Sequence, residues 1–314
     1  MPPKRLFDIL VAGEINPDLI LSGNVIPEFG QVEKLVDTAV LTIGSSSAIF
    51  ACAAARLGLK VAFVGICGTD IFGRYMLDEL SQRGVDVSGV IVDPALQTGL
   101  SVILNHGLQG DRAILTHLGA ISRLQARQVT DNLLQNACHL HVASYFLQTA
   151  LQPGLPALFQ RAQRLGLTTS LDTNWDPSGE WRGFEKLLRH TDIFLPNQNE
   201  ALAVSGAPTL EAALHFLGKK CQAVAIKCGR DGALARRADE IARAPAVPVQ
   251  VVDTVGAGDS FDAGFLCGWL NGWSLERTLA LAAACGSLTT RAAGGTSAQP
   301  TLDEAMRYLP QADT

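Results

Sequence analysis

A carboxylate stands inside a glycine-rich turn in the stretch Asp253-Thr-Val-Gly-Ala-Gly-Asp-Ser-Phe261. Gly256, Ala257 and Gly258 precede Asp259, and a helix-compatible run follows. Unpaired N–H groups at a helix start can hold phosphate oxygens, and glycines let those oxygens approach the backbone. Because a carboxylate repels a bound polyphosphate, we expect Asp259 to have a chemical task, such as accepting a proton from an attacking hydroxyl. The alternative is structural, a tight turn in which the helix dipole favours Asp259.

Polar side chains also follow the first predicted strand, Leu6 to Ala12. Asn16 and Asp18 flank Pro17 in the loop that comes next. Open α/β sheets bind polar ligands at the carboxyl ends of their strands, and these two side chains suit a polyol. Local hydrogen bonds to the backbone of a turn are the alternative.

A second polar pair follows the apolar run Ile193 to Pro196 at a predicted helix start. Asn197 and Glu200 are three residues apart, so both can face the same way on the first helical turn. A capping box, which only stabilises the helix end, explains the same spacing.

The elements that must position these residues alternate between strands and helices. Helical patterns are expected at Ala48–Leu57, Ile71–Arg83, Gln125–Asn136 and Pro153–Leu165, and apolar strand patterns at Lys60–Cys67, Val85–Val92, Cys138–Ala143, Leu167–Leu171 and Ala223–Lys227. The Asp259 turn itself follows an alternating apolar run, Val247 to Val252, which predicts a strand before it. This order predicts an α/β fold with a mostly parallel central sheet flanked by helices on both faces.

Residues 15–43 and 98–118 break this rhythm. Two alternating runs within Thr98–Thr116 flank a polar turn, Asn105 to Arg112, which is typical of an antiparallel hairpin. Together with the alternating runs before residue 43, the hairpin predicts a small β-sheet lid over the mouth of an α/β site.

Composition narrows the class of protein. The chain has 314 residues, of which 47% are hydrophobic and 18% charged, so it can bury a full core. A net charge of −5 and a pI of about 5.7 argue against binding to nucleic acid or to an anionic membrane. We therefore expect any phosphate ligand to be held by local groups.

The cysteines and histidines do not predict a metal site. The seven cysteines form no CxxC pair and lie mostly in apolar runs, as buried thiols do in a reducing compartment. His139 and His141 alternate along one predicted strand without ligand-type neighbours. The sequence also lacks a leader or a membrane-length apolar stretch, which predicts a cytoplasmic protein.

Taken together, these segments resemble the ribokinase-like carbohydrate kinases of the PfkB family, in the same order from Gly13 to about Pro300. The resemblance implies a single ribokinase-like domain over residues 1–314, ATP and Mg²⁺ as cofactors, and a homodimer formed through the lid. In its most specific motif, Asp253–Asp259, the last residue would be the catalytic base. The amides of Gly256, Ala257 and Gly258 would form the anion hole.

The resemblance assigns further residues to ligands. The positions on the substrate side are Asn16, Asp18, Gly44 and Ser45. The positions on the nucleotide side are Lys227, Gly229 and Gly232, together with the Asn197 and Glu200 of an NxxE motif associated with Mg²⁺ through water. The family's anion loop often has a K⁺ ion beside it, and backbone oxygens of Asp253 and Val255 would hold that ion.

Some positions depart from the family pattern. Ser45 and Ile49 stand where the family usually has glycine and asparagine, and Ala283 replaces an asparagine found near the adenine in many members. The arginine often found after a mid-chain Asp-x-Asn is missing after Asp172-Thr-Asn174. The departures bear on the acceptor and on base recognition, because none lies in the Asp253–Asp259 motif.

We therefore expect transfer of the ATP γ-phosphoryl group to a primary hydroxyl of a sugar or sugar-like polyol. Arg112 and His106 are the only obvious candidates in the lid for binding a sugar phosphate, which favours an unphosphorylated acceptor. One alternative is a nucleoside kinase of the same family, with Ile49 or Tyr145 lining a slot for the base. Another is a sugar-binding relative without catalysis. A dinucleotide-dependent oxidoreductase is disfavoured because no GxGxxG follows the first strand.

Overall fold

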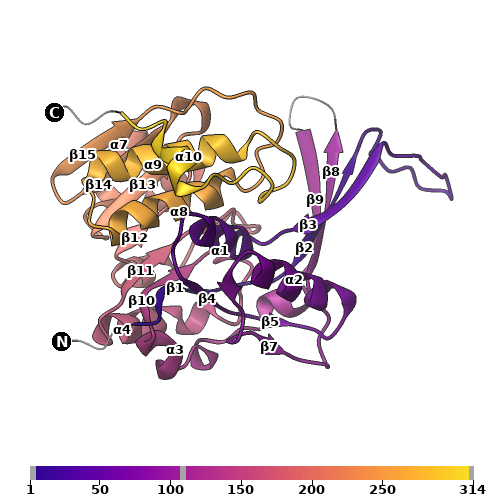
Figure 1. The fold of residues 1–314 in the computed structure, drawn as a ribbon, viewed down its shortest axis with the longest axis horizontal. Helices are drawn as coiled ribbons and strands as arrows, with labels where there is room; N and C mark the ends of the chain where they lie inside the picture. Colours follow the sequence, from indigo (N-terminus) through magenta and orange to yellow (C-terminus); the bar gives the residue numbers. More distant parts are fainter. Residues whose placement is uncertain (1–4, 107–110, 311–314) are drawn as a thin grey trace.

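The computed structural model describes residues 5–106 and 111–310, which form a body and a projecting sheet (Figure 1). The body is built on a nine-stranded sheet in the order β15-β14-β13-β12-β11-β10-β1-β4-β6. The strands from β13 to β6 pair in parallel, whereas β14 and β15 add an antiparallel edge. Their bounds are β1 Phe7–Ala12, β4 Val61–Val64, β6 Val85–Asp86, β10 Ala137–Val142, β11 Thr168–Leu171, β12 Ile193–Phe194, β13 Ala223–Lys227, β14 Ala233–Arg237 and β15 Glu240–Ala244.

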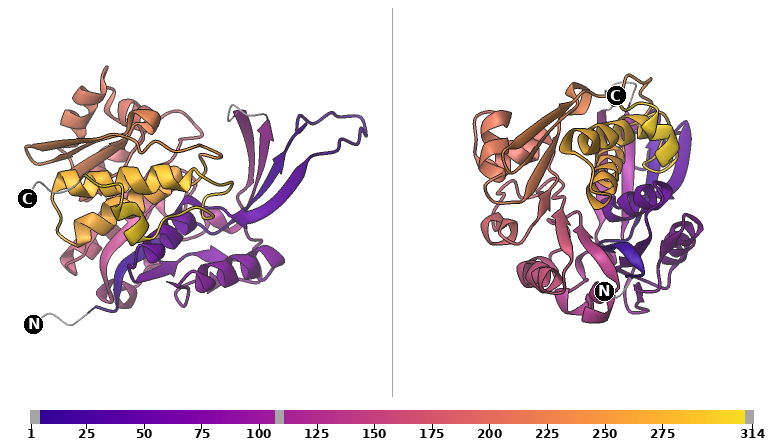
Figure 2. Two further views of the ribbon diagram at one scale, coloured as in Figure 1. Left: turned by 45° about the horizontal axis from the view of Figure 1, so that its top comes forward. Right: turned by 60° about the vertical axis from the view of Figure 1, so that its left-hand side comes forward.

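Helices cover both faces of this sheet, as Figure 2 shows from two further directions. They are α1 Ser46–Arg56, α2 Ile71–Gln82, α3 Asp131–Gln135, α4 Leu155–Arg164, α5 Phe184–Leu188, α6 Gln198–Ser205, α7 Leu210–Leu217, α8 Ala257–Leu270, α9 Leu275–Thr289 and α10 Leu302–Met306. Alternate side chains of β1 enter two separate cores. Ile9 and Val11 pack in the core that contains residues of α1, α8 and α9. Leu10 and Ala12 pack in the core that contains residues of α4 and α7. This three-layer arrangement confirms the predicted α/β fold.

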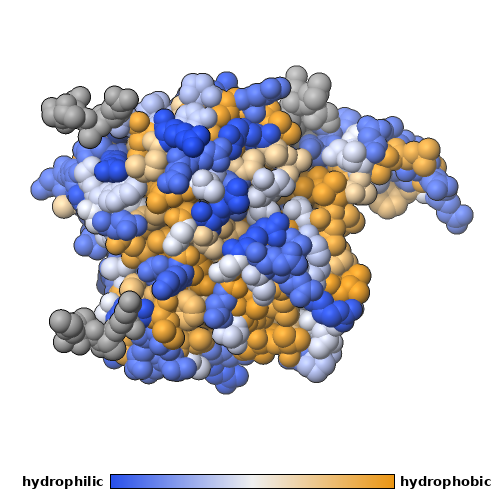
Figure 3. All heavy atoms as spheres, viewed as in Figure 1, coloured by the Kyte–Doolittle hydropathy of each residue, from blue (hydrophilic) through white to orange (hydrophobic). Residues whose placement is uncertain are grey.

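The predicted lid forms a four-stranded sheet in the order β3-β2-β8-β9. Its strands are β2 Pro17–Ser22, β3 Thr38–Ile43, β8 Leu100–His106 and β9 Asp111–His117. The tip of the predicted hairpin turn, residues 107–110, lies outside the described residues. Figure 3 shows apolar residues among polar ones on the arm that this sheet forms beside the body. The central pair, β2 with β8, is parallel, so the two predicted segments join into one sheet.

One predicted strand is wrong. Val247 to Val252 forms no strand, and the strand before the Asp259 turn is β15, which ends at Ala244. Pro245 and Pro248 explain the difference, because proline cannot donate a hydrogen bond to a neighbouring strand. The run from residue 245 to 252 is therefore an extended segment that is free to line a cavity.

Other predicted elements are divided. The helix expected at Gln125–Asn136 is a 3₁₀ turn, Ala126–Gln128, followed by the short α3, because Thr130 has an extended backbone and caps α3. The strands expected at Lys60–Cys67 and Val85–Val92 each split, and their second halves, β5 Ile66–Cys67 and β7 Ile91–Val92, pair in a separate two-stranded sheet. None of the described helices combines the length and apolar character that a membrane crossing requires.

Candidate active site

Asp259 lies on the first turn of α8, and 7% of its surface is exposed. The helix begins after Gly256, whose φ of 73° is left-handed, and a Cβ on Gly256 would lie 2.5 Å from Gly295 Cα. Only glycine fits this turn, and the next two residues, Ala257 and Gly258, line a cavity beside α8. Burial, followed by the nearby Asp172 carboxylate, raises the pKa of Asp259 to about 8. The side chain is therefore a carboxyl group that can take up a proton near neutral pH.

A buried cation lies beneath this turn. Lys227 Nζ, at the end of β13, lies 2.9 Å from Asp172 Oδ2 and 3.1 Å from both Asp262 carboxylate oxygens. Burial alone would lower the pKa of Lys227, but the carboxylates of Asp172, Asp262 and Glu200 raise it above its ordinary value. Lys227, which the resemblance assigns to the nucleotide side, thus has an ammonium group bonded to two aspartates that the sequence did not connect with it. It joins the ends of β11 and β13 to the first turns of α8.

The Asn197–Glu200 pair forms the capping box that its spacing allows. Glu200 Oε2 accepts a hydrogen bond from the Asn197 backbone N–H at 2.9 Å, and Asn197 Oδ1 accepts one from the Glu200 N–H at 3.0 Å. Glu200 is 3% exposed, and burial followed by Asp172 raises its pKa to about 7. The pair therefore caps α6 and also lies within electrostatic reach of Lys227.

Asn16 and Asp18 lie together at the root of the lid. Asn16 Nδ2 donates to Asp18 Oδ1 at 3.3 Å and lies 3.5 Å from Ser101 Oγ on β8. A Cβ on Gly44 would lie 2.0 Å from Asp18 Oδ1, so this position must be glycine for the carboxylate to fit. Burial raises the pKa of Asp18 to about 7, although Arg112 opposes the shift.

A chain of polar side chains behind Asp259 was not predicted from the sequence. Ser46, at the start of α1, is a hydrogen-bond partner of Asp259 and accepts a hydrogen bond from Asn174 Nδ2 at 2.6 Å. Asn174 Nδ2 also reaches Ser144 Oγ at 2.8 Å, and Ser144 Oγ donates to the buried Glu14 at 2.8 Å. Glu14 stands directly after Gly13 at the end of β1, and that place on the sheet edge was the available signal.

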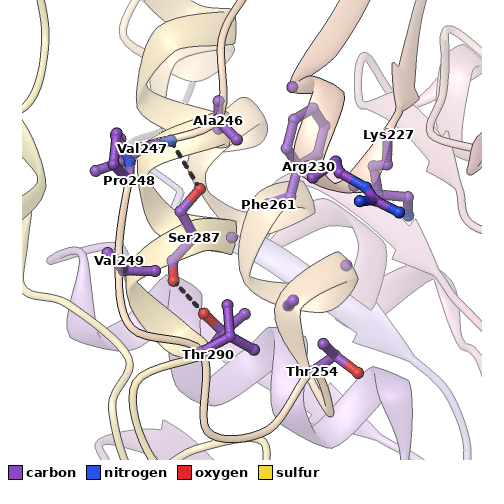
Figure 4. A pocket seen from close by; sticks show the side chains of 17 residues that line it. Lys227, Arg230, Ala246, Val247, Pro248, Val249, Thr254, Phe261, Ser287 and Thr290 are labelled. Atoms are coloured by element: carbon purple, nitrogen blue, oxygen red, sulfur yellow. Dashed lines mark hydrogen bonds between the residues drawn. The ribbon is translucent and has the colours of Figure 1, made fainter. Parts of the chain in front are cut away.

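A partly open cavity of about 520 Å³ lies next to the Asp259 turn (Figure 4). It is lined by Gly229 and Gly232, which the resemblance assigns to the nucleotide side, and also by Lys227, Ala257 and Gly258. A Cβ on Gly232, whose φ is 86°, would lie 2.0 Å from Ala244 O, so the turn requires glycine. The remaining walls are largely apolar, formed by Ala246, Val247, Pro248, Val249, Phe261 and Ala283 among others. The cavity thus offers an apolar slot beside the amides of α8.

A second cavity, of about 980 Å³, separates the lid from residues 250–255. Ile20, Ile103 and Arg112 are among the lid residues that line it. On the opposite wall, Asp253 Oδ1 accepts from the Val255 N–H at 3.0 Å and Asp253 Oδ2 from the Gly294 N–H at 2.9 Å. The Asp253 side chain therefore fixes the loop that leads into α8.

The positions that depart from the family pattern lie close to the anion-binding turn or line the first cavity. Ile49 is buried, and added Cβ atoms on Gly256 and Gly295 would lie 2.9 and 2.6 Å from its side-chain carbons. Ser45 has a φ of 66° and caps α1 by accepting from the Ala48 N–H. Tyr145 is 7% exposed and packs edge-on against Phe146. Ile49 and Tyr145 are thus core residues, with little surface to offer a second base.

His139 and His141 are fully buried and bond to hydroxyls. His139 Nδ1 lies 2.6 Å from Thr168 Oγ1, and both histidines lie 2.7 Å from Ser170 Oγ. Burial lowers the pKa of both imidazoles. Among the described residues, no three His, Cys, Asp or Glu side chains are arranged to hold a metal ion directly.

A glycine-rich helix start, a buried carboxyl group on its first turn and an adjoining apolar cavity define the class of protein as an α/β phosphotransferase. The comparisons with known proteins agree. The family model described as pfkB family carbohydrate kinase matches residues 7–302, and the chain belongs to this family of carbohydrate kinases.

Its relatives match over nearly their whole length. The chain is 31% identical to an ATP-dependent ribose-1-phosphate kinase of Halopiger xanaduensis, over 96% of this chain and 98% of that protein. It is 28% identical to a ribokinase of Haemophilus influenzae, over 97% and 99%. An E. coli structure assigned to a ribokinase II, in complex with ATP and Mg²⁺, superposes with a TM-score of 0.86 at 25% identity, covering 96% of this chain and 99% of the other.

Proposed function

We propose that this protein transfers the γ-phosphoryl group of ATP to a primary hydroxyl of a sugar or sugar-like polyol. The observation that carries the proposal is the position of Asp259, a buried carboxyl group on the first turn of α8 beside an apolar cavity. The cavity suits the base and ribose of ATP, with the phosphates directed to the amides of Gly256, Ala257 and Gly258.

Asp259 is the general base of the proposed reaction. A pKa of about 8 lies close to the working pH, which suits a group that must take a proton from a hydroxyl as the new P–O bond forms. The hydroxyl oxygen attacks the γ-phosphorus, the bond to the β-phosphate oxygen breaks, and ADP leaves. The helix-start amides would stabilise the charge on the transferring group.

Asn197 and Glu200 are proposed to hold Mg²⁺ through water. Both Glu200 oxygens are already hydrogen-bonded within the capping box, and one carboxylate with one amide makes an incomplete ligand set. That donor set fits Mg²⁺, which usually keeps several waters and binds phosphate oxygens. When bound, the ion would neutralise charge on the nucleotide phosphates.

A potassium ion at the anion loop is proposed only through backbone oxygens of Asp253 and Val255. The Asp253 carboxylate is used within the protein, since it accepts hydrogen bonds from the backbone N–H groups of Val255 and Gly294. This bonding braces the loop and leaves its carbonyl groups as the donors for the ion. A rise in turnover with K⁺ over Na⁺ is the expected sign of this site.

The sugar is proposed to bind between the lid root and Asp259. Asn16 and Asp18 provide an amide and a carboxylate for hydroxyl groups, and both are more than nine-tenths buried. Because the ribose-1-phosphate kinase relative acts on a sugar phosphate, phosphorylated sugars belong in the acceptor panel beside free ribose and ketoses. A nucleoside acceptor gains no support from Ile49 or Tyr145, since both are packed in the core.

We further propose a homodimer formed through the lid, working in the cytoplasm. Eight residues in the middle of one face of the lid, here called the apolar lid face, are apolar: Leu19, Leu21, Ala39, Leu41, Val102, Leu104, Ala113 and Leu115. Leu41 and Leu115 are 39% and 61% exposed, so a second copy could bury them. Seven free cysteines fit a reducing compartment.

A panel of sugars, sugar phosphates and nucleosides with ATP and Mg²⁺, monitored by ADP release, tests the proposed reaction. We expect acceptor-dependent ADP release with at least one sugar or polyol. Binding of sugars without ADP release above the rate in their absence would favour the non-catalytic relative, and release with nucleosides alone would favour the nucleoside kinase.

A further inference from the structure

We infer that Arg112 makes the acceptor site specific for an anionic sugar, one that carries a phosphate or carboxylate group remote from the hydroxyl that is phosphorylated. The inference rests on the proposed sugar kinase activity and narrows its substrate class. It also revises the expectation of an unphosphorylated acceptor, which came from the small number of cations in the lid segments and not from their positions.

The strand register places Arg112 on the lid face that lines the second cavity. Residues that pair directly across strands point to the same side of a sheet, and every second residue along each strand shares that side. Three rows of β2, β8 and β9 residues therefore share one face: Asp18, Ser101 and Thr116 at the root, Ile20, Ile103 and Ile114 in the middle, and Ser22, Asn105 and Arg112 toward the tip. Five of these residues, Arg112 among them, line the cavity of about 980 Å³.

This arrangement sets a polyol site and a cation on one wall. The root and tip rows are four residues apart along β2, which corresponds to roughly 13 Å at the usual rise of a strand. Arg112 nonetheless lies within electrostatic reach of the Asp18 carboxylate, and it lines the cavity beside the lid. A sugar held at Asn16 and Asp18 would meet Arg112 with its far end.

The positive charge of Arg112 is not neutralised within the described part of the chain. None of the ion pairs or side-chain hydrogen bonds there includes Arg112. The acidic side chains on the same cavity have other partners or positions. Asp253 accepts hydrogen bonds from two backbone N–H groups. Asp37 lies beside Gly23, next to β2 and β3. Arg112 belongs to β9, the edge strand on the opposite side of the lid sheet.

A guanidinium group recognises planar or tetrahedral oxyanions with two parallel N–H donors, which a neutral hydroxyl cannot match. The acceptor therefore has a defined chemical form. It presents a free primary hydroxyl to Asp259, hydroxyl groups to Asn16 and Asp18, and a phosphate or carboxylate to Arg112. No group other than the hydroxyl reacts, and the anionic group serves only for recognition.

The test compares kcat/KM for charged and neutral acceptors in the full chain. Ribose 1-phosphate and 2-keto-3-deoxygluconate supply the phosphate and carboxylate forms, and ribose and fructose are the neutral forms. We expect the wild-type protein to prefer one of the charged acceptors. Arg112→Ala should lower kcat/KM for that acceptor about 10- to 100-fold, mainly by raising KM. For the neutral sugars, the same substitution should change kcat/KM less than about twofold.

Two further variants make the comparison specific. Arg112→Lys keeps the charge but loses the paired donors, so its kcat/KM should fall between those of the wild type and Arg112→Ala. Arg123→Ala removes an exposed arginine that lines neither cavity and should match the wild type. Equal or better turnover of neutral sugars by the wild type, or an equal loss for all acceptors in Arg112→Ala, would overturn the inference.

Calorimetry separates this inference from the proposed activity. If no acceptor supports ADP release, the proposed function fails, but binding of ribose 1-phosphate and ribose can still be measured. Tighter binding of ribose 1-phosphate that Arg112→Ala abolishes would support the anion site even then. Equal binding of both sugars would contradict it.

Discussion

Asp259 shows how a carboxylate becomes useful at this site through crowding and burial. Asp172, Asp262 and Glu14 lie within electrostatic reach of it, and Lys227 is the cation that Asp172 and Asp262 contact directly. Burial disfavours every charged carboxylate, so removal of Lys227 would leave negative groups uncompensated. With a pKa of about 8 the Asp259 carboxyl group holds its proton at neutral pH, and a bound Mg²⁺ would favour the ionised form that can accept the hydroxyl proton.

This arrangement predicts how stability depends on pH. Asp259 ionises near 3.8 in the unfolded chain and at about 8 in the folded protein, so between these values the folded state binds more protons. The free energy of unfolding therefore falls as pH rises through this window. D259N cannot ionise, so denaturant unfolding should show D259N gaining stability relative to the wild type from pH 5 to pH 8.

Burial also raises the pKa values of Asp18 and Glu200 to about 7. The free energy of unfolding of D259N should therefore still fall as pH rises, but less steeply than that of the wild type. The exposed Glu276 provides the control, since E276Q should follow the wild type at both pH values. A difference between D259N and wild type that stays constant from pH 5 to pH 8 would refute the buried, protonated carboxyl group.

At the scale of elements, the turn into α1 is strained at the position where the family usually has glycine. Ser45 has φ 66° and ψ 118°, a conformation that costs a residue with a Cβ about 1–3 kcal/mol. Its hydroxyl donates to Glu14 O at 2.7 Å and accepts from the Ala48 N–H at 3.0 Å. S45A and S45G both remove these bonds, so the pair isolates the strain.

We expect S45G to be more stable than S45A by about 1 kcal/mol. Relief of the strain outweighs the roughly 0.4–1 kcal/mol that glycine loses through greater freedom of the unfolded chain. Thermal or denaturant unfolding of the two variants side by side measures this difference. An S45A variant as stable as S45G would show that the backbone at this position is unstrained.

Some of the elements could be predicted from the sequence, and some could not. The turn at Asp259, the residues after β1 and the lid hairpin each have a local signal of glycines, strand ends or alternating runs. The contacts of Lys227 have no local signal in the sequence, because Asp172 lies 55 residues and Asp262 lies 35 residues from it along the chain. The alternating apolar pattern at Val247 to Val252 led to a wrong strand prediction. Apolar residues of this run line the first cavity, and Pro248 prevents strand pairing.

At the scale of the whole molecule, the lid has two different faces. One carries Asp18 and Arg112 toward the second cavity, and the apolar lid face points the other way. Exposed apolar side chains on the apolar lid face favour a partner there, and the proposed partner is a second copy of the chain. Assembly would then hold the lid at the site.

We therefore expect the wild type to be a dimer and L115K to be a monomer by light scattering, because a charge on the apolar lid face cannot be buried unpaired. I241K is the matched control. Ile241 on β15 is 59% exposed, close to the 61% of Leu115, but lies in the body. A monomeric wild type, or dimers of both variants, would contradict assembly through the lid.

The most direct test of the central claim is turnover by D259N with the best acceptor, alongside ATP binding by calorimetry. We predict that kcat falls about 10²- to 10⁴-fold while ATP affinity changes little, because the amides of α8 and the apolar cavity remain. Full turnover by D259N would contradict the account, since another group would then have to accept the proton of the attacking hydroxyl.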